Sequence, residues 1–576
     1  MWRFQLLFAF IVISVVAVIG RLFYWQVFVK DSLVVRAEQQ HLFTTQVPAW
    51  RGEIFSADGA KLVTNRPAFL LYAWLPSLTE KKGETVKALA PLLLASEEAT
   101  LTARQQQRTV QEKEKELSTL FAAKDLSWIP LERKVDQSVK KSIDELGLEG
   151  IGFERDTQRY YPEASMAAQL LGFVGANDLG QDTGYFGVEG YYNRDLTGKA
   201  GVIRQERDAK GRPILIGNYQ VTKQENGRDL VLYLDRTIQF FVEQHLASGM
   251  AKYGAKAAQA VVIDPQTGGI LAMAAFPSYD QLRFDQFDVA FYKNPVVADT
   301  YEPGSTFKVL VMAAGIQEGV VKPDTLCSVC GGPRNIGGFT IRTWNNKYQP
   351  NQTMTDVIVH SDNTGMTYVA EKLGLDKLYK YLDGFGFGRP TGVDLQEETS
   401  APLRPKQEWH PIDVATVSFG QGIATTAMQM VNAVAAIANG GKLLEPHVVS
   451  KIVSDQREIV IKPKVVRQVI RADTAKLVTE MMVAAVEHGE AKWTKLPGYR
   501  IAGKTGTAQI PIEGHYDPQK TIASFVGFAP ADDPRFVMLV RYTEPSSSPY
   551  GAETAAPTFF AIAKDILRYW HIPPSQ

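Results

Sequence analysis

The sequence predicts an α+β protein with a single N-terminal transmembrane helix, and three observations support this fold class. An uncharged apolar run lies at residues 4–20. Short alternating strands and charged helical stretches follow it. The C-terminal part then combines apolar hairpin strands with alanine-rich helical stretches, which indicates an antiparallel sheet with helices packed on it.

Composition limits the possible classes of protein. A chain of 576 residues is long enough for two or more domains. Hydrophobic residues make up 45% and charged residues 22%, which disfavours disordered, collagen-like and multi-span membrane proteins. Sixty-two Lys and Arg balance 62 Asp and Glu, so a nucleic-acid partner bound by a bulk basic field is not expected.

The N-terminal apolar run predicts a membrane anchor. Phe4 to Gly20 contains no charge, and the chain beyond Arg21 continues apolar to about Val29. A helix over this stretch can cross ~30 Å of hydrocarbon. A cleaved signal peptide is the alternative, but Ile19 and Arg21 stand where a cleavage site needs small residues. We expect an uncleaved single-pass anchor in the cell (inner) membrane, a cytoplasmic N-terminus and a large domain outside the cytoplasm.

A mixed αβ region follows the anchor. Alternating residues predict strands around 44–47 and 53–55, and the dipeptide Asp58-Gly59 predicts a tight hairpin turn. From Leu78 to about Leu126 the pattern is helical, with charged and glutamine-rich faces typical of a solvated surface.

A third region begins near Leu230 with a strand and a helix over 237–251. Two apolar strands then flank Asp264–Gly269, a turn that specifies an antiparallel hairpin. Later segments add two more strands and two alanine-rich helices, at 524–530, 535–544, 426–439 and 474–489.

Ser305 and Lys308 are the first candidates for catalysis. Pro303-Gly304 precedes an apolar helical run, so Ser305 is expected in the first turn of a helix. At a spacing of three the two side chains share a face, and the helix N-terminus disfavours the charged ammonium. A neutral lysine can deprotonate a serine. The pattern alone is weak, because about two Ser-x-x-Lys matches arise by chance at this length, and Ser138 to Lys141 is another match.

Two further motifs strengthen this assignment. Ser361-Asp362-Asn363 stands 56 residues after Ser305 (361 − 305), and Lys504-Thr505-Gly506-Thr507 stands 143 residues further on (504 − 361). Taken singly, the first could be a helix cap or turn and the second a strand with a glycine bulge. All three motifs in this order form the signature of penicillin-binding proteins and class A β-lactamases.

Over nearly its whole length the chain resembles a class B penicillin-binding protein, a membrane-anchored peptidoglycan D,D-transpeptidase. Further matching phrases are Arg51-Gly52-Glu53-Ile54 with Asp58-Gly59, Gly187-Val188-Glu189 with Leu196-Thr197-Gly198, and Ser418 to Gly422. The resemblance implies an anchor at residues 1–30, an elongated αβ pedestal of the dimerisation type at 31–225, and a penicillin-binding transpeptidase domain at 226–576. That domain is expected to hold an antiparallel five-stranded sheet flanked by helices, as in serine β-lactamases.

The phrases FGFGRPTGVDL, PGYRIAGKTGTAQ and SFVGFAPADDPRF look most like division-type (FtsI-like) enzymes, with elongation-type relatives second. The resemblance therefore implies septal cell-wall synthesis, with an FtsW-like SEDS glycosyltransferase and other divisome proteins as partners. The implied substrates are stem peptides ending in D-Ala-D-Ala, and β-lactam antibiotics are implied inhibitors.

The resemblance also implies a role for each motif residue. Ser305 is the expected nucleophile and Lys308 its base, while Ser361 and Lys504 relay a proton to the leaving amine. Asn363 orients Lys308 and holds the substrate amide. Thr505, Gly506 and Thr507 are expected to bind the substrate, and the backbone N–H groups of Ser305 and Thr507 to form the oxyanion hole. No cofactor or metal is required.

The three motifs are also compatible with other functions. A β-lactamase or D,D-carboxypeptidase shares the chemistry, but a secreted lactamase needs neither pedestal nor anchor. The sequence offers no convincing deacylating glutamate, and Glu408 is unplaced. A non-catalytic β-lactam sensor or scaffold is the alternative from another class, although the complete motif set argues for turnover.

Cys327 and Cys330, the two cysteines of the chain, stand in one short loop after the helix of Ser305. Outside the cytoplasm a small-loop disulfide is the favoured interpretation, with free thiols as the alternative. A zinc site would need two more ligands, for which His360 is the only candidate nearby in the sequence.

Overall fold

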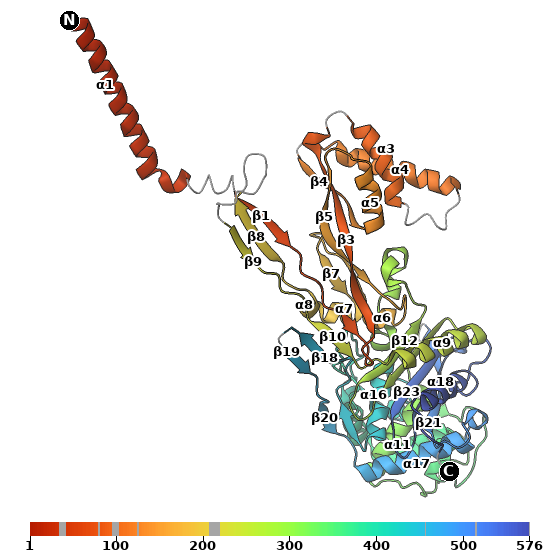
Figure 1. Ribbon diagram of the computed structural model, residues 1–576. Helices are drawn as coiled ribbons and strands as arrows, with labels where there is room; N and C mark the ends of the chain where they lie inside the picture. Colours follow the sequence, from red (N-terminus) through yellow and green to blue (C-terminus); the bar gives the residue numbers. More distant parts are fainter. Residues whose placement is uncertain are drawn as a thin grey trace. The chain divides into compact units, whose positions relative to one another are not determined.

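The computed structural model of the protein describes residues 1–33, 42–78, 81–94, 103–123, 126–206, 219–455, 457–512 and 515–574. The chain forms two compact units, each assembled from separate stretches (Figure 1). The first unit comprises Met1–Arg51, Pro67–Thr157 and Thr197–Gly227, and the second comprises Gly52–Arg66, Gln158–Leu196 and Arg228–Gln576. Two early stretches, 52–66 and 158–196, therefore pack with the C-terminal part of the chain.

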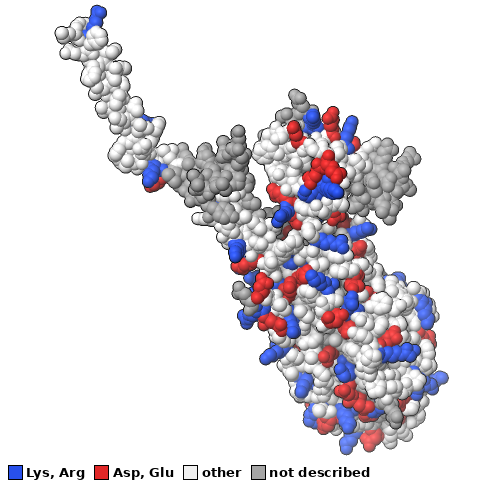
Figure 2. Space-filling view, in the orientation of Figure 1, with Lys and Arg blue, Asp and Glu red and all other residues white. Residues whose placement is uncertain are grey.

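The N-terminal helix has the length and surface of a membrane anchor. Helix α1 (Trp2–Phe23) continues into the π-helical turn η1 (Tyr24–Phe28), giving 27 residues, or ~40 Å at the α-helical rise. None of their side chains is buried, and Figure 2 shows this helix almost free of charge. Arg21 stacks over Trp25 near the end of the apolar stretch. The predicted apolar span is confirmed.

The first unit holds an αβ layer after the anchor. The C-terminal part of β3 (Lys61–Trp74) pairs with β4 (Trp128–Val135), and apolar residues of α3 (Lys82–Leu94), α4 (Ala103–Phe121) and α5 (Gln137–Glu145) form a core with them. A three-stranded antiparallel sheet joins β1 (Leu42–Val47), β8 (Gly201–Glu206) and β9 (Tyr219–Thr222). The helices predicted between 78 and 126 are confirmed.

The second unit begins with the predicted hairpin. β2 (Ile54–Phe55) pairs antiparallel with the N-terminal part of β3, and Ser56 N donates to Ala60 O at 2.9 Å across the Asp58-Gly59 turn. Gly59 has a φ of 81°, which explains why glycine occupies this turn. On its other side β2 pairs in parallel with β10 (Asp229–Leu232), so residues near 54 and 230 are neighbours.

A five-stranded antiparallel sheet forms the centre of the second unit, as expected. Its strand order is β12 (Ile270–Phe276), β11 (Ala257–Ile263), β23 (Phe536–Thr543), β22 (His515–Ala529) and β21 (Ala502–Ile512). The hairpin β11–β12 is the one predicted from its turn, in which the Asp264 carboxylate accepts from Gln266 N at 2.8 Å. Among the strands that the structure describes, β21 lies at the edge of this sheet, and the Lys504 motif pairs with β22 on one side alone.

Helices cover both faces of this sheet, as the alternation of β11 requires. Ala260 and Val262 pack in one core with α9 (Arg236–Tyr253) and α18 (Ala555–Tyr569). Val261 and Ile263 point to the other face and pack in a core with α11 (Lys308–Gln317), α16 (Ala427–Ala438) and α17 (Ala472–His488). The predicted helices at 237–251, 426–439 and 474–489 are confirmed.

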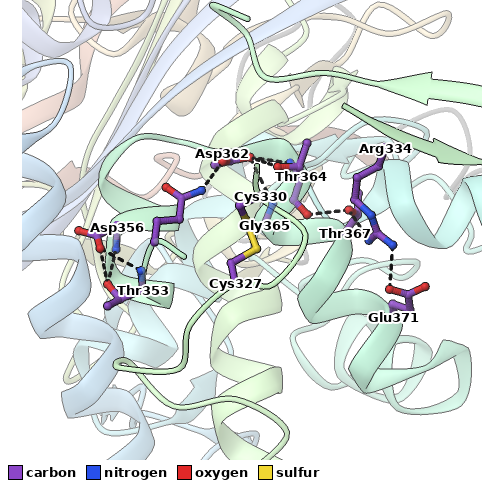
Figure 3. Close-up of a disulfide and its surroundings, with 11 residues drawn as sticks. Cys327, Cys330, Arg334, Thr353, Asp356, Asp362, Thr364, Gly365, Thr367 and Glu371 are labelled. Carbon is purple, nitrogen blue, oxygen red and sulfur yellow. Dashed lines mark hydrogen bonds and ion pairs between the residues drawn. A yellow bond between two sulfur atoms is a disulfide. The ribbon is translucent and has the colours of Figure 1, made fainter. Parts of the chain in front are cut away.

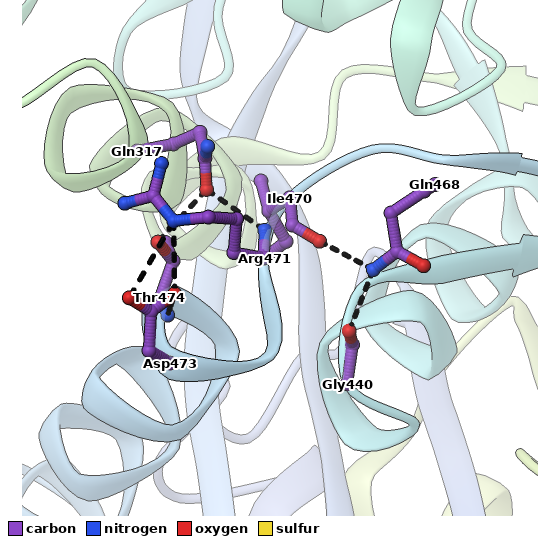
Figure 4. A network of polar contacts seen from close by, with 7 residues as sticks. All are labelled: Gln317, Gly440, Gln468, Ile470, Arg471, Asp473 and Thr474. Atoms are coloured by element: carbon purple, nitrogen blue, oxygen red, sulfur yellow. Dashed lines mark hydrogen bonds and ion pairs between the residues drawn. The ribbon is translucent and has the colours of Figure 1, made fainter.

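Polar contacts fix the far end of α11 (Figure 4). Gln317 Oε1, in the last residue of α11, accepts from Arg471 N and from Thr474 Oγ1, both at 2.8 Å. Gln468 Nε2 donates to Gly440 O at 2.8 Å and to Ile470 O at 2.6 Å, which orders the chain entering α17. The helix that begins with Lys308 is therefore tied to the start of α17.

Candidate active site

The candidate nucleophile lies in a tight turn. Gly304–Phe307 forms a 3₁₀ turn (η6) that leads into α11, so Ser305 precedes the α-helix instead of lying in its first turn. Ser305 is half-buried, whereas Lys308 is fully buried at the start of α11. Gly420 supports the turn, since Gly304 N donates to Gly420 O at 3.0 Å and a Cβ on Gly420 would lie 2.2 Å from Gly304 O.

Lys308 is held by three oxygen acceptors. Its Nζ lies 2.6 Å from Ser361 O, 3.2 Å from Ser361 Oγ and 2.8 Å from Asn363 Oδ1. Burial lowers the pKa of Lys308 well below its usual value, and the charge of Lys504 lowers this pKa further. A buried amine in this state can accept a proton from a hydroxyl.

Ser361 and Asn363 lie at the junction of two helices. Ser361 has a φ of 56° and stands between α12 (Met354–Val359) and α13 (Asn363–Leu373). Asp362 caps α13, accepting from Thr364 N at 2.7 Å. Asn363 accepts a hydrogen bond from Lys308 through Oδ1 and donates one from Nδ2 to the carbonyl of Arg342 at 2.9 Å. Both ends of its amide therefore contact the protein.

The Lys504 motif lies on β21. Lys504 is buried, and its Nζ donates to Thr505 O and Thr505 Oγ1, both at 3.2 Å. Burial lowers the pKa of Lys504, while the nearby charge of Glu490 acts in the opposite direction. Gly506 allows close packing, because a Cβ there would lie 2.4 Å from Ser524 Oγ, and Thr507 Oγ1 accepts from Gly551 N at 3.1 Å.

One cavity of about 320 Å³ brings the motif residues together. Ser305, Ser361, Asn363, Thr505 and Thr507 all line it. Lys308 and Lys504 are buried and do not line the cavity. The residues that the sequence predicted from three distant motifs therefore converge on one site. Within the described residues, no group of three His, Cys, Asp or Glu could hold a metal ion.

The cavity has further walls that the sequence motifs did not indicate. Trp344 and Tyr550 line the cavity, and their ring centroids are 5.6 Å apart. Gln421, from the predicted Ser418–Gly422 turn, lines it as well. Glu490 also lines the cavity, and its Oε2 accepts from Thr505 Oγ1 at 3.3 Å. Glu408, the unplaced glutamate, lies in a 3₁₀ turn and is not a lining residue. No local pattern distinguishes Glu490, because it reaches the site only through the packing of α17 on β21.

Cys327 and Cys330 form a disulfide next to the segment that supports the site (Figure 3). Cys327 N donates to Gln352 O at 2.8 Å, and the Gln352 side chain donates to Asp362. Thr353 and Asp356 then cap α12 reciprocally. The disulfide loop thus packs against the chain that leads to Ser361.

One phrase that resembles a pedestal motif supplies the acidic partner of a buried ion pair. Glu189, on α7 (Gly187–Tyr191), is fully buried, and its carboxylate lies 2.6 Å from Arg159 Nε. Arg159 also donates to Asn65 Oδ1 at 2.9 Å. Tyr192, which follows α7, donates to Asp394 at 2.8 Å. These contacts all lie inside the second unit.

Two family models match the chain in succession. Residues 46–232 match the penicillin-binding protein dimerisation domain, and residues 258–568 match the penicillin-binding protein transpeptidase domain. The second model alone covers more than half of the chain.

Individual relatives are similar over the full chain. Stage V sporulation protein D of Bacillus subtilis is 33% identical over 100% of this chain and 86% of its own length. Peptidoglycan D,D-transpeptidase FtsI of Escherichia coli is 30% identical over 100% of this chain and 92% of its own. The crystal structure of penicillin-binding protein 3 from Mycobacterium tuberculosis with aztreonam covers 92% of this chain and 98% of its own, at 25% identity and a TM-score of 0.68. The chain therefore belongs to the class B penicillin-binding proteins and is a peptidoglycan D,D-transpeptidase.

Proposed function

We propose that the protein cross-links stem peptides during septal wall synthesis through an acyl-enzyme on Ser305. The observation that carries this proposal is the buried Lys308 amine, held by Ser361 and Asn363 behind the cavity that Ser305 lines. Ser305 Oγ attacks the carbonyl carbon of the penultimate D-alanine while Lys308 takes the hydroxyl proton. The terminal D-alanine leaves with a proton relayed by Ser361 and Lys504.

Substrate binding uses the edge strand β21. The backbone N–H groups of Ser305 and Thr507 stabilise the tetrahedral oxyanion. Thr505 and Thr507, which line the cavity, bind the terminal carboxylate beside the charge of Lys504, with Gly506 allowing close approach. The amine of a second stem peptide then attacks the acyl-enzyme and forms the cross-link.

β-Lactams acylate Ser305 by the same attack. Two findings support this proposal. The similar penicillin-binding protein 3 of Mycobacterium tuberculosis has a crystal structure in complex with aztreonam, and residues 258–568 match the penicillin-binding protein transpeptidase domain. A lactam ring occupies the place of the D-Ala-D-Ala amide, and its acyl group stays on Ser305 because the leaving amine remains attached.

Septal placement rests on two observations. The FtsI relative is 30% identical over the full chain, and the apolar helix Trp2–Phe28 can hold the protein at a membrane. We assign residues 1–30 to a cytoplasmic tail and anchor, 31–225 to the pedestal and 226–576 to the exported transpeptidase domain. An FtsW-like SEDS glycosyltransferase, acting through anchor and pedestal, supplies the glycan strands.

Sporulation is the second candidate role. The relative named Stage V sporulation protein D is 33% identical over the full chain, a similar level to that of FtsI. Both roles use the same acyl transfer, so only the time and place of action separate them.

Fluorescent penicillin tests the chemistry. The purified protein is expected to take up the label covalently, and Ser305→Ala to lose it. Ser138→Ala is the matched control, because Ser138 starts a chance Ser-x-x-Lys match on the exposed face of α5. Label that persists in Ser305→Ala would refute the assigned nucleophile. A fluorescent fusion with no septal enrichment in dividing cells would refute the septal role.

A further inference from the structure

The central strand of the five-stranded sheet carries a buried arginine. Arg541 lies on β23 and is 5% exposed. Its neighbours Val540 and Tyr542 pack in the core with α9 and α18, whereas Leu539 packs in the core with α11. Because side chains alternate along a strand, Arg541 points to the face of the sheet that carries α11. The strand therefore places a charged group in the core, on the side of the helix that begins with Lys308.

Arg541 lacks the countercharge that a buried guanidinium ordinarily has. Its Nη1 donates to Gln259 Oε1 at 3.3 Å and its Nη2 to Thr543 Oγ1 at 3.4 Å, while its Nε has no partner in the described chain. It forms no ion pair with any carboxylate of the described residues, and Asp299 acts on it through charge alone, at longer range. Arginine is seldom fully buried unless it is paired. Another contact therefore stabilises it here.

The aromatic ring of Tyr301 supplies that contact. Arg541 Cζ lies 4.3 Å from the centroid of this ring. The negative face of an aromatic ring attracts a cation, and most strongly where both groups are removed from water, as they are here with 5% and 4% exposure. Burial raises the pKa of Tyr301 to about 12, against the charge of Arg541, so the phenol is neutral. Its hydroxyl has no hydrogen-bond partner among the described residues, so the ring makes the contact.

Tyr301 stands directly before the nucleophile turn. It ends β13 (Thr300–Tyr301), which pairs antiparallel with β16 (Thr425–Thr426). The turn Gly304–Phe307 follows after two residues, so a shift of Tyr301 reaches Ser305 through a very short connection. Two residues are short for a strand, and backbone pairing alone holds β13 weakly. The contact with Arg541 therefore fixes this strand against the sheet.

We propose that Arg541 is a positioning residue, which holds the chain before Ser305 through the ring of Tyr301 and so sets the rate of acylation. The inference rests on the proposed function, since it concerns the same nucleophile. Both residues are buried and lie outside the lining of the active-site cavity, so they act on the geometry of attack and not on binding. An apolar side chain could occupy the place of Arg541 without the cost of burying a charge, which favours a role in activity over one in stability.

A double-mutant cycle tests the contact. The detergent-solubilised full chain receives rising concentrations of fluorescent penicillin, and the time courses give the maximal acylation rate and the half-saturating concentration. We expect Arg541→Met and Tyr301→Leu each to lower the maximal rate about tenfold, the effect of a small misplacement of the nucleophile, with an unchanged half-saturating concentration. The double variant should be as slow as each single variant, because each change breaks the same contact. The conservative variant Tyr301→Phe keeps the ring and should restore the wild-type rate.

Fluorinated phenylalanines at position 301, introduced by nonsense suppression, test the ring itself. Ring fluorines weaken the negative face while the size of the side chain hardly changes. We expect the acylation rate to fall with each added fluorine when Arg541 is present, and to be independent of fluorination in Arg541→Met. A role in packing alone would show no such dependence. The series with Arg541 present decides the matter even if Arg541→Met does not fold.

Arg535→Met is the matched control. Arg535 directly precedes β23, and its Cζ lies 5.9 Å from the ring centroid of Trp570, the residue after α18. This variant removes the same kind of contact beside the same strand, away from Tyr301, and should keep the wild-type rate. Multiplying effects of Arg541→Met and Tyr301→Leu in the double variant, or a rate that does not respond to fluorination when Arg541 is present, would overturn the inference. Absence of covalent label on the wild type would instead refute the proposed function.

Discussion

Lys308 Nζ lies 2.8 Å from Asn363 Oδ1, so the first residue of α13 holds the amine at the start of α11. The other contacts of this amine, with Ser361, are also neutral oxygens. Asp362, the acid that stands between Ser361 and Asn363, directs its Oδ1 to the N-terminus of α13. Neutral acceptors orient the amine without adding a direct countercharge, and burial then keeps the pKa of Lys308 low.

Asn363→Asp tests this electrostatic arrangement. A carboxylate in contact with Lys308 favours the ammonium, so we expect the pKa of Lys308 to rise. Acylation by penicillin needs the neutral amine, and the rise of its rate with pH should therefore move to higher pH. The measurement is the acylation rate from about pH 5 to pH 10. Asn363→Ala removes the contact without adding charge and should slow acylation by ~100-fold, with no upward shift. A wild-type profile in Asn363→Asp would contradict this account.

The low pKa of Lys308 also makes stability depend on pH. Between this lowered folded pKa and the unfolded value of about 10.4, the unfolded chain binds a proton that the folded chain does not. The free energy of unfolding should therefore rise with pH in this window, by up to ~1.4 kcal/mol per unit. Lys308→Met should reduce that slope, measured as urea midpoints at about pH 7 and pH 9. Lys504 changes the unfolding free energy with pH in the same direction, and it is present in both proteins. Equal slopes in the wild type and in Lys308→Met would therefore show that Lys308 is charged in the folded protein.

Much of the second unit could be predicted because its signals are local. The turn at Asp264–Gly269 and the alternation in β11 depend on neighbouring residues, and both appear as expected. The three motifs could also be recognised in the sequence, because each is a short run of residues of defined chemical type. Their convergence on one cavity depends on the fold and was implied by resemblance alone.

Glu490 could not be predicted because its contact partner is set by packing. It stands 15 residues before Thr505, and the two meet only because the end of α17 lies beside β21. The placement of 52–66 in the second unit has the same cause, since it depends on the pairing of Ile54 with Leu230. Contacts between segments far apart in the chain leave no periodic signal in either segment.

Gly420→Ala is expected to disturb the nucleophile turn. Gly420 has a φ of 81°, and its Cβ would lie 2.2 Å from Gly304 O, so backbone must move beside Ser305. We expect a loss of more than ~2 kcal/mol in unfolding free energy and an acylation rate reduced at least about tenfold. Gly319→Ala is the control, because Gly319 has a φ of 70° but open space around it. That variant should pay about 1–2 kcal/mol of backbone strain and keep its acylation rate. Equal acylation rates in both variants would argue against support of the turn by Gly420.

Removal of the disulfide should destabilise the chain that supports Ser361. Cys327 and Cys330 are three residues apart, and a loop this short contributes about 2 kcal/mol in the chain-entropy model. Cys327→Ser/Cys330→Ser also places two hydroxyls in a buried site. Denaturation is measured with and without reductant. We expect reductant to lower the unfolding free energy of the wild type, and the double variant to have a still lower unfolding free energy. In the reduced wild type, the free thiols are blocked and counted to verify that the disulfide has opened. If its unfolding free energy is then the same as without reductant, this expectation is contradicted.

The buried pair of Arg159 and Glu189 offers a test of the second unit that leaves the active site untouched. The two side chains are 5% and 0% exposed and 2.6 Å apart, so Glu189→Gln removes the carboxylate that contacts this buried guanidinium. Such a change costs about 3–5 kcal/mol, whereas replacing both partners by apolar residues is often close to neutral. We therefore expect Glu189→Gln to lower the urea midpoint strongly and Arg159→Met/Glu189→Leu to recover most of the loss. Penicillin uptake at low temperature should persist in both variants, because neither residue lines the cavity of Ser305. If the double variant is no more stable than the single one, the cost lies in packing and in the contact with Asn65, and not in the unpaired charge.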